Sequence, residues 1–144
     1  MVELLGKAVE RLPNLAGVKY THEDLAEFVA CQAAWGDRLE FMFGRDELLL
    51  PALASGAVAA VGTFYGIVPQ VFQQIIAAFR NQDLRSARRW ALYANQYIEV
   101  CKQVGVIPAG KALNARADFA TDRVRLPLRT LAAIENEDSH SDLR

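Results

Sequence analysis

The chain has 144 residues, of which 52% are hydrophobic and 23% are charged, and its formal net charge is −1. This length suits one domain with a sizeable core, and the composition excludes an intrinsically disordered chain. The near-neutral charge favours neither nucleic acid nor an anionic membrane as a partner, and no apolar run approaches the roughly 20 residues of a membrane span.

The first 66 residues alternate between predicted helices and short apolar strands. Helices are expected over 2–12, 22–35 and about 48–54, and strands over 15–18, 39–43 and 57–61. Thr21 followed by Asp24 fits a capping signature at the start of the second helix. Strand–helix repeats of about 20 to 25 residues imply parallel strands joined by right-handed crossovers.

The rest of the chain is predicted to be helical almost to its end. One amphipathic helix follows Pro69, and a longer helix ends before Gly105–Pro108. A short helix over 110–117 and a last helix through Leu131 and Ile134 complete the pattern.

We therefore expect a single domain over 1–144. Three strand–helix units occupy 1–66, C-terminal helices occupy 67–137, and a frayed tail occupies 138–144.

The cysteines and histidines do not predict a metal site or a disulfide. Cys31 and Cys101 lie far apart on expected helices, and His22 and His140 have no ligand pattern around them. The cysteines are interpreted as small buried side chains in a reducing compartment. The first residues are too short and too charged a run for a signal sequence, so a cytoplasmic location is the simplest expectation.

Polar side chains follow the carboxyl end of each predicted strand. Lys19 and Thr21 follow the first strand, Asp46 and Glu47 the second, and Thr63 the third. The carboxyl ends of parallel strands lie on one edge of a sheet, where α/β folds keep their chemistry, so these side chains could face a common site. The alternative for Lys19 is an ordinary strand-end lysine with its stem on apolar surface and its ammonium in water.

Three segments, Gly17–Thr21, Phe43–Glu47 and Gly62–Tyr65, together resemble the N-acetylneuraminate lyase branch of the dihydrodipicolinate synthase superfamily. Gly110–Leu113 and Arg125–Leu128 also resemble that family's C-terminal region. The resemblance implies an α/β fold, namely a partial (β/α)8 TIM barrel made of the last three strand–helix units and followed by a C-terminal helical region. The first five strands of a family barrel have no counterpart in this sequence.

The resemblance also implies a class I aldolase or lyase. Lys19 would form a Schiff base with pyruvate or with the keto carbon of a sugar acid. The protonated imine withdraws electrons from the neighbouring carbon, so this chemistry needs no metal or organic cofactor. The implied partner is a small 2-keto acid or sugar acid, without nucleic acid or membrane.

The remaining site residues follow from the same resemblance. Thr21 would contact the substrate beside the lysine. Gly44, Asp46 and Glu47 match family positions that bind the hydroxyls of the sugar chain, where carboxylates accept several hydrogen bonds. Thr63 stands where lyases commonly have a serine that also contacts substrate.

Two functional interpretations remain open. The first is a sugar-acid lyase, or the half of one that carries the Schiff-base lysine. The second is a non-catalytic half-barrel remnant or assembly module, because the absent strands carry the carboxylate-gripping motif and a proton-relay tyrosine, which cannot be assigned to Tyr20, Tyr65, Tyr93 or Tyr97. Three strands cut from a barrel expose two edges and a sheet face, so we expect a homo-oligomer or a completing partner chain, and weak or no activity of the chain alone.

Overall fold

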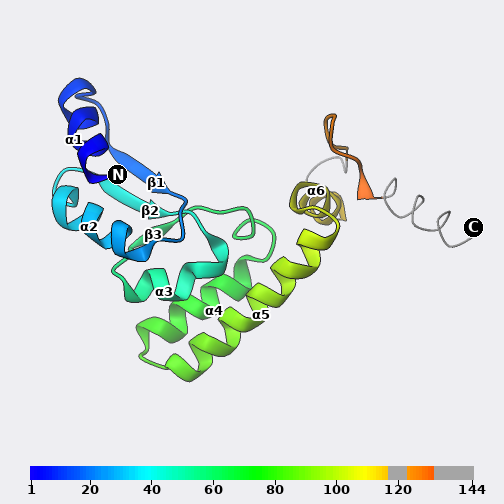
Figure 1. The fold of residues 1–144 in the computed structure, drawn as a ribbon. Coiled ribbons are helices and arrows are strands. Elements are labelled where there is room, and N and C mark those ends of the chain that lie inside the picture. Colours follow the sequence, from blue (N-terminus) through cyan, green and yellow to red (C-terminus); the bar gives the residue numbers. More distant parts are fainter. Residues whose placement is uncertain (117–122, 132–144) are drawn as a thin grey trace, which may run out of the picture.

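A small parallel sheet lies in the N-terminal half of the molecule (Figure 1). Strands β1 (Gly17–Tyr20), β2 (Glu40–Phe43) and β3 (Ala59–Ala60) follow one another in the order β1-β2-β3, and both pairs are parallel. The structure is a computed structural model that describes residues 1–116 and 123–131. The predicted parallel arrangement is confirmed.

All three strands differ from their predicted bounds: β1 extends to Tyr20 and so includes Lys19, and β2 begins one residue later than predicted, at Glu40. β1 begins at Gly17 because the chain is still turning at Leu15, whose N–H donates to the Leu12 carbonyl at 3.0 Å. β3 is shorter than the predicted run, and only Ala59 and Ala60 pair with β2.

The helices follow the expected order. They are α1 (Val2–Arg11), α2 (Leu25–Trp35), the single 3-10 turn η1 (Asp46–Leu48), α3 (Leu49–Ala54), α4 (Pro69–Arg80), α5 (Leu84–Gln103) and α6 (Val106–Arg116). The prediction that Gly105–Pro108 forms the whole break before a helix at Gly110 is wrong, because α6 already begins at Val106. Pro108 lies in the first turn of α6, where its missing N–H costs no helical hydrogen bond, and Gly105 alone turns the chain with a φ of +91°. The predicted last helix and the predicted frayed tail lie mostly or wholly outside the described residues.

Helix α2 begins later than predicted, and its cap is Asp24 rather than Thr21. The Asp24 side chain accepts a hydrogen bond from the Glu27 N–H at 2.9 Å. The prediction that Thr21 caps this helix is wrong, because three irregular residues separate Thr21 from the first helical residue, Leu25. Thr21 is therefore available to the sheet edge.

One face of the sheet is packed against α2 by aromatic rings. Tyr20, Phe41 and Phe43 alternate with outward residues along β1 and β2, and their rings lie 5.2 to 6.3 Å from the ring of Phe28. Phe28 and Phe43 are fully buried. Rings at such separations gain more than their buried area alone, so this cluster fixes the position of β1 and β2 on α2.

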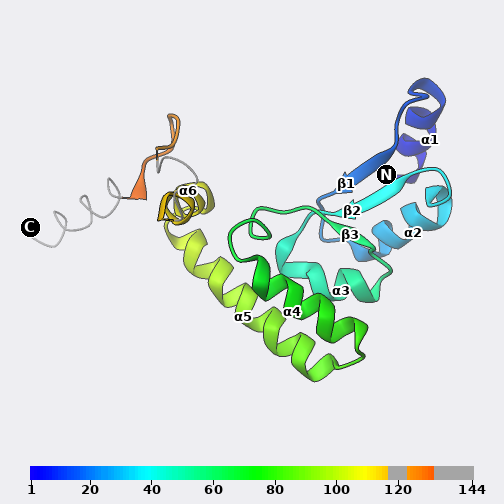
Figure 2. The same ribbon diagram turned by 180° about the vertical axis from the view of Figure 1, so that it is seen from behind.

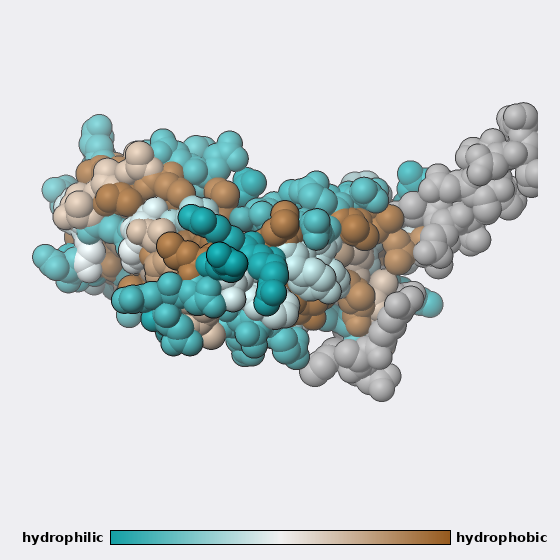
Figure 3. Space-filling view, turned by 90° about the horizontal axis from the view of Figure 1, so that it is seen from below, coloured by the Kyte–Doolittle hydropathy of each residue, from teal (hydrophilic) through white to brown (hydrophobic). Residues whose placement is uncertain are grey.

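The C-terminal helices form a second core, against which Ala60 of β3 also packs. Ile75 of α4 and Ala94 and Ile98 of α5 are buried together with Leu49 of α3. Figure 2 shows α4 and α5 running side by side beneath α3. The turn that joins them, residues 81–83, is polar and exposed. Hydrophilic side chains gather at the front of the view from below (Figure 3).

The opposite face of the sheet is open. Lys19 of β1 and Ala59 of β3 are exposed on this face, and Val61, just beyond β3, is 42% exposed. Figures 1 and 2 show no described helix over it, because α4, α5 and α6 pack against α3 and one another. In addition, none of the described helices is long and apolar enough to span a membrane.

Candidate active site at the carboxyl edge of the sheet

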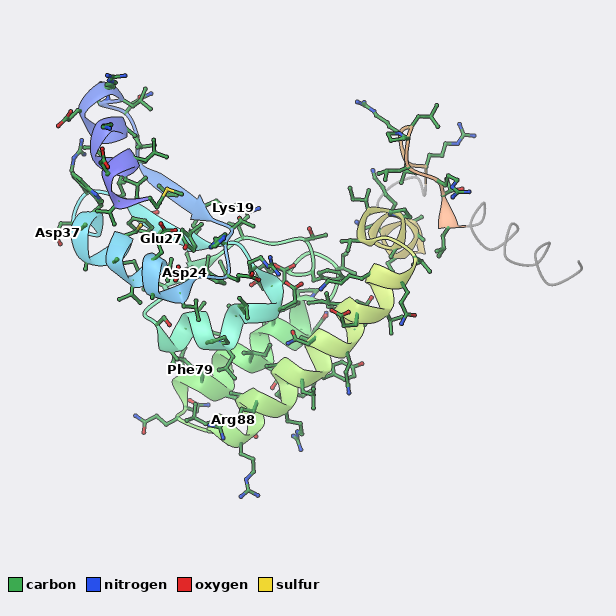
Figure 4. The ribbon with its side chains drawn as sticks, in the orientation of Figure 1. Lys19, Asp24, Glu27, Asp37, Phe79 and Arg88 are labelled. Carbon is green, nitrogen blue, oxygen red and sulfur yellow. The ribbon has the colours of Figure 1, made fainter. Side chains whose placement is uncertain are left out.

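Lys19 lies on the open face, near the carboxyl end of β1 (Figure 4). Thr21 follows two residues later, just beyond the strand. The register pairs Lys19 with Met42 and Met42 with Ala59, so these three side chains form one row. Thr21 and Gly44 fall in the next row, since residues two apart on a strand share a face. Lys19 thus stands on the face that would line the interior of a closed barrel.

Gly44, directly after β2, allows the side chains of Lys19 and Thr21 to approach it closely. A Cβ at Gly44 would overlap the Thr21 Oγ1 and would lie 3.0 Å from the Lys19 Cε. The absence of a side chain at this position therefore leaves room for both. The structure brings Lys19, Thr21 and Gly44 together.

Asp46 is the one charged residue buried within the described part of the chain. It is 8% exposed, and its Oδ2 accepts a hydrogen bond from the Phe64 N–H at 2.8 Å. Burial is the main cause that raises the pKa of this carboxyl above its ordinary value, and the charge of Glu47 adds to it. The Phe64 amide and the charge of Lys19 act in the opposite direction, which indicates that Lys19 lies within electrostatic reach.

The second oxygen of Asp46 lies against the backbone that leaves β3. A Cβ at Gly62 would overlap this carboxylate. Oδ1 is buried and finds no hydrogen-bond partner among the described residues. A buried acceptor that has no partner in the protein costs stability.

Thr63 lies in the segment that Asp46 holds, and it lines a small cavity. The cavity has a volume of about 240 Å³, and it is bounded by the β3–α4 loop and by α6, including Lys111 and Asn114. Thr63 is therefore at the same edge as the lysine but on the side that faces the C-terminal helices.

Glu47 is turned toward α5. Its Oε1 lies 2.8 Å from the Lys102 Nζ, and its Oε2 lies 3.8 Å from the Arg45 Nε. Burial by itself raises the pKa of Glu47, but the hydrogen bond from Lys102 and the charges of Lys102 and Arg45 outweigh it, so the pKa is lowered. The carboxylate is therefore held in its charged form, which only accepts hydrogen bonds.

Two tyrosines near this edge differ in what their hydroxyls contact. The Tyr20 hydroxyl donates to the Asp24 carbonyl and to the Glu27 carboxylate on the α2 side of the sheet, away from Lys19. The Tyr65 ring packs edge-on against Phe72, and its hydroxyl is buried without a partner among the described residues. Burial and the charges of Asp46 and Glu47 raise the pKa of Tyr65, so it is a neutral phenol beside two acids.

The α5 residues that reach Glu47 were not predicted from the sequence. Asn95 donates a hydrogen bond to the Glu47 carbonyl at 3.3 Å, and Lys102 binds the side chain of the same residue. The only local signal was that these two residues are seven apart and so share a face of α5. That spacing does not indicate which distant element the face meets.

Metal ligands are not clustered in the described part of the chain. No group of three or more His, Cys, Asp or Glu residues there could hold a metal ion. Cys31 and Cys101 are buried free thiols, and burial raises the pKa of each.

Comparison with known proteins gives a consistent family. The model of the Dihydrodipicolinate synthetase family matches residues 2–144. The N-acetylneuraminate lyase of Xenopus tropicalis is 39% identical over 87 residues, which are 60% of this chain and 28% of that protein. The chain spans between 28% and 40% of the length of the curated relatives it matches.

Solved structures agree with this comparison. The N-acetylneuraminate lyase of Proteus mirabilis superimposes with a TM-score of 0.87 at 29% identity, over 98% of this chain and 48% of that one. The N-acetylneuraminate lyase of Fusobacterium nucleatum, solved in complex with pyruvate, superimposes with a TM-score of 0.80 at 25% identity, over 91% of this chain and 44% of that one. The predicted α/β fold, corresponding to about half of a TIM barrel, is confirmed. With a family match over nearly all its residues, and with the parallel sheet and helices of the solved lyases, this chain belongs to the dihydrodipicolinate synthetase family.

Proposed function

We propose that this chain carries the Schiff-base half of a class I lyase that acts on a sugar acid such as N-acetylneuraminate. The observation that supports it best is the placement of Lys19, Thr21 and Gly44 in adjoining rows at the carboxyl edge, within electrostatic reach of the buried Asp46. The relatives named N-acetylneuraminate lyase support the substrate class.

In the proposed reaction, the Lys19 amine attacks the keto carbon of the sugar acid. The carbonyl oxygen takes up protons and leaves as water, which gives a protonated imine. A base takes the proton of the hydroxyl on the second carbon from the imine carbon, and the oxygen of that hydroxyl becomes the aldehyde oxygen of the released sugar. The bond between this carbon and the carbon next to the imine breaks, and its electron pair forms the enamine. Protonation of the remaining enamine and hydrolysis of the imine release pyruvate and restore the free amine.

We assign the binding of the sugar-chain hydroxyls to the other site residues. Thr21 would contact the substrate beside Lys19, and Gly44, Asp46, Glu47 and Thr63 would hold the sugar chain. The imine is covalent, so we propose no cofactor. Free cysteines at 31 and 101 are consistent with a cytoplasmic location, which stays a prediction.

The test is reduction of the imine with borohydride in the presence of pyruvate and, separately, of N-acetylneuraminate. We expect a stable adduct that peptide mapping assigns to Lys19 and that Lys19→Ala abolishes. Lys7→Ala is the matched control, because Lys7 is an exposed lysine on α1 with a glutamate partner of its own. Failure of the folded wild-type chain to form the adduct would refute the lyase proposal.

The second candidate is an assembly module without turnover, and the open sheet face favours it. Lys19 is exposed to water on that face, whereas an amine nucleophile works best where water is excluded. β1 and β3 each pair on one side only within the described sheet, so both present a free edge. In this proposal a second copy or a completing partner chain covers the face, and the chain alone has weak or no activity.

A further inference from the structure

The strongest unassigned feature near the site is the contact between α5 and Glu47. Lys102 is placed between two carboxylates, with its Nζ 2.8 Å from the Oε1 of Glu47 and 2.8 Å from the Oε1 of Glu99. Asn95 holds the Glu47 backbone carbonyl from the same face of α5. Two residues of one helix thus fix both the backbone and the side chain of a single distant residue.

This arrangement leaves the two Glu47 oxygens in different surroundings. Oε1 is engaged by Lys102, whereas Oε2 lies 3.8 Å from Arg45, which is beyond hydrogen-bond length. Glu47 is only 22% exposed, so the ion pair is shielded more than an ordinary surface pair. Oε2 therefore keeps its capacity to accept a hydrogen bond from a ligand.

We propose that Lys102 is a positioning residue for Glu47, which holds Oε1 so that Oε2 is presented to a hydroxyl of the substrate. The inference rests on the proposed function, in which Glu47 binds the sugar chain. Asn95 completes the arrangement by fixing the backbone of η1 on α5. The C-terminal helices then contribute to substrate recognition without contacting the substrate.

Several charged or titratable groups lie around the Glu47 carboxyl and bear on its titration. Asp46 precedes it in η1, Arg45 pairs with it and also lies 3.9 Å from Glu23, and Lys102 is shared with Glu99 on α5. Tyr65, on the β3–α4 loop, is close enough for the Glu47 charge to affect it. Among these groups, Lys102 makes the shortest contact with the Glu47 side chain, so its removal is the most direct perturbation.

The first experiment follows the titration of the Glu47 carboxyl by carbon-detected NMR in the full chain. Lys102→Met should raise the titration midpoint of Glu47, because the hydrogen bond and the positive charge are lost together. Lys102→Arg should return the midpoint toward the wild-type value, since the guanidinium keeps both charge and donors. Lys7→Met, which breaks an exposed 2.7 Å lysine–glutamate pair on α1, should leave it unchanged. An unchanged midpoint in Lys102→Met overturns the proposal.

The second experiment separates positioning from a general structural role. The concentration of N-acetylneuraminate that gives half-maximal borohydride labelling of Lys19 should rise about tenfold in Lys102→Met, equivalent to one lost hydrogen bond to a charged group. The corresponding concentration of pyruvate should not change, because pyruvate has no hydroxyl chain. Equal changes for both ligands overturn the proposal. Absence of labelling in the wild-type chain overturns the proposed function instead, and the titration alone then decides whether Lys102 holds Glu47.

Discussion

Asp46 combines burial, charge and a free acceptor atom in one side chain. Its Oδ2 ties η1 to the segment after β3 through the Phe64 amide, while its Oδ1 has no partner among the described residues. A fold that needed only the tie to Phe64 could use a neutral side chain at this position. The charge is therefore a cost to stability that the proposed binding of hydroxyls explains.

Asp46→Asn tests this cost through its dependence on pH. The native pKa of Asp46 is raised above the unfolded value, so its contribution to stability is full at low pH and is lost as the pH rises through the native pKa. Asparagine keeps an acceptor for the Phe64 amide but does not titrate. As the pH rises through this interval, the free energy of unfolding of Asp46→Asn should therefore increase relative to that of the wild type. Above the interval the difference between the two should stay constant. Urea unfolding at a series of pH values measures it, and a difference that is independent of pH would refute the assignment.

At the scale of single elements, two polar residues of the loop between β1 and α2 have different roles. Asp24 caps α2, and Thr21 stays beside Gly44 at the sheet edge. The sequence pattern assigned both to the cap because serine, threonine, aspartate and asparagine all satisfy the rule for capping residues. Only the position of the first helical residue, Leu25, separates the two roles.

Asp24→Ala and Thr21→Ala form a matched pair. Asp24→Ala should lower the free energy of unfolding by about 1 kcal/mol, because the Glu27 N–H loses its acceptor at the start of the helix. Thr21→Ala should leave the stability nearly unchanged and should instead weaken the labelling of Lys19. Chemical denaturation and the borohydride assay distinguish the two effects. A comparable loss of stability in Thr21→Ala would contradict this prediction and would indicate that Thr21 also caps α2.

At the scale of the whole molecule, two cores position the residues of the site. The core between the sheet and α2 fixes Lys19 and Thr21, and the core of α3 to α6 carries the side chains that hold Glu47. The site thus lies where the two cores meet, and the open sheet face adjoins it. Covering that face would exclude water from Lys19, and strands added beside β1 and β3 would pair the free edges.

Self-association through the open face can be measured directly. We expect the sedimentation coefficient of the chain to increase with concentration, and Val61→Lys to shift this increase to at least about tenfold higher concentration, because a buried lysine without a partner is unfavourable. Leu4→Lys is the control, since Leu4 is 61% exposed on α1, away from this face. A monomer at every concentration that melts cooperatively would argue against the assembly module.

Much of the architecture was predictable because it depends on local patterns. Apolar periodicity and turn residues predicted the parallel strands, the order of the helices and the polar residues at each strand exit, and the three motifs predicted the family. The exact starts of α2, α6 and β1 were missed, because helix and strand ends depend on which competing hydrogen bond forms.

What only the tertiary structure decided concerns residues far apart in the chain. The buried Asp46 accepts a hydrogen bond from the Phe64 amide, 18 residues further along the chain. Asn95 and Lys102 of α5 fix the backbone and the charged side chain of Glu47. The sequence by itself determined which side chains stand at the carboxyl edge, because alternation along a strand is a local property. Their electrostatic state depends instead on packing between elements separated by dozens of residues, and no local pattern records that packing.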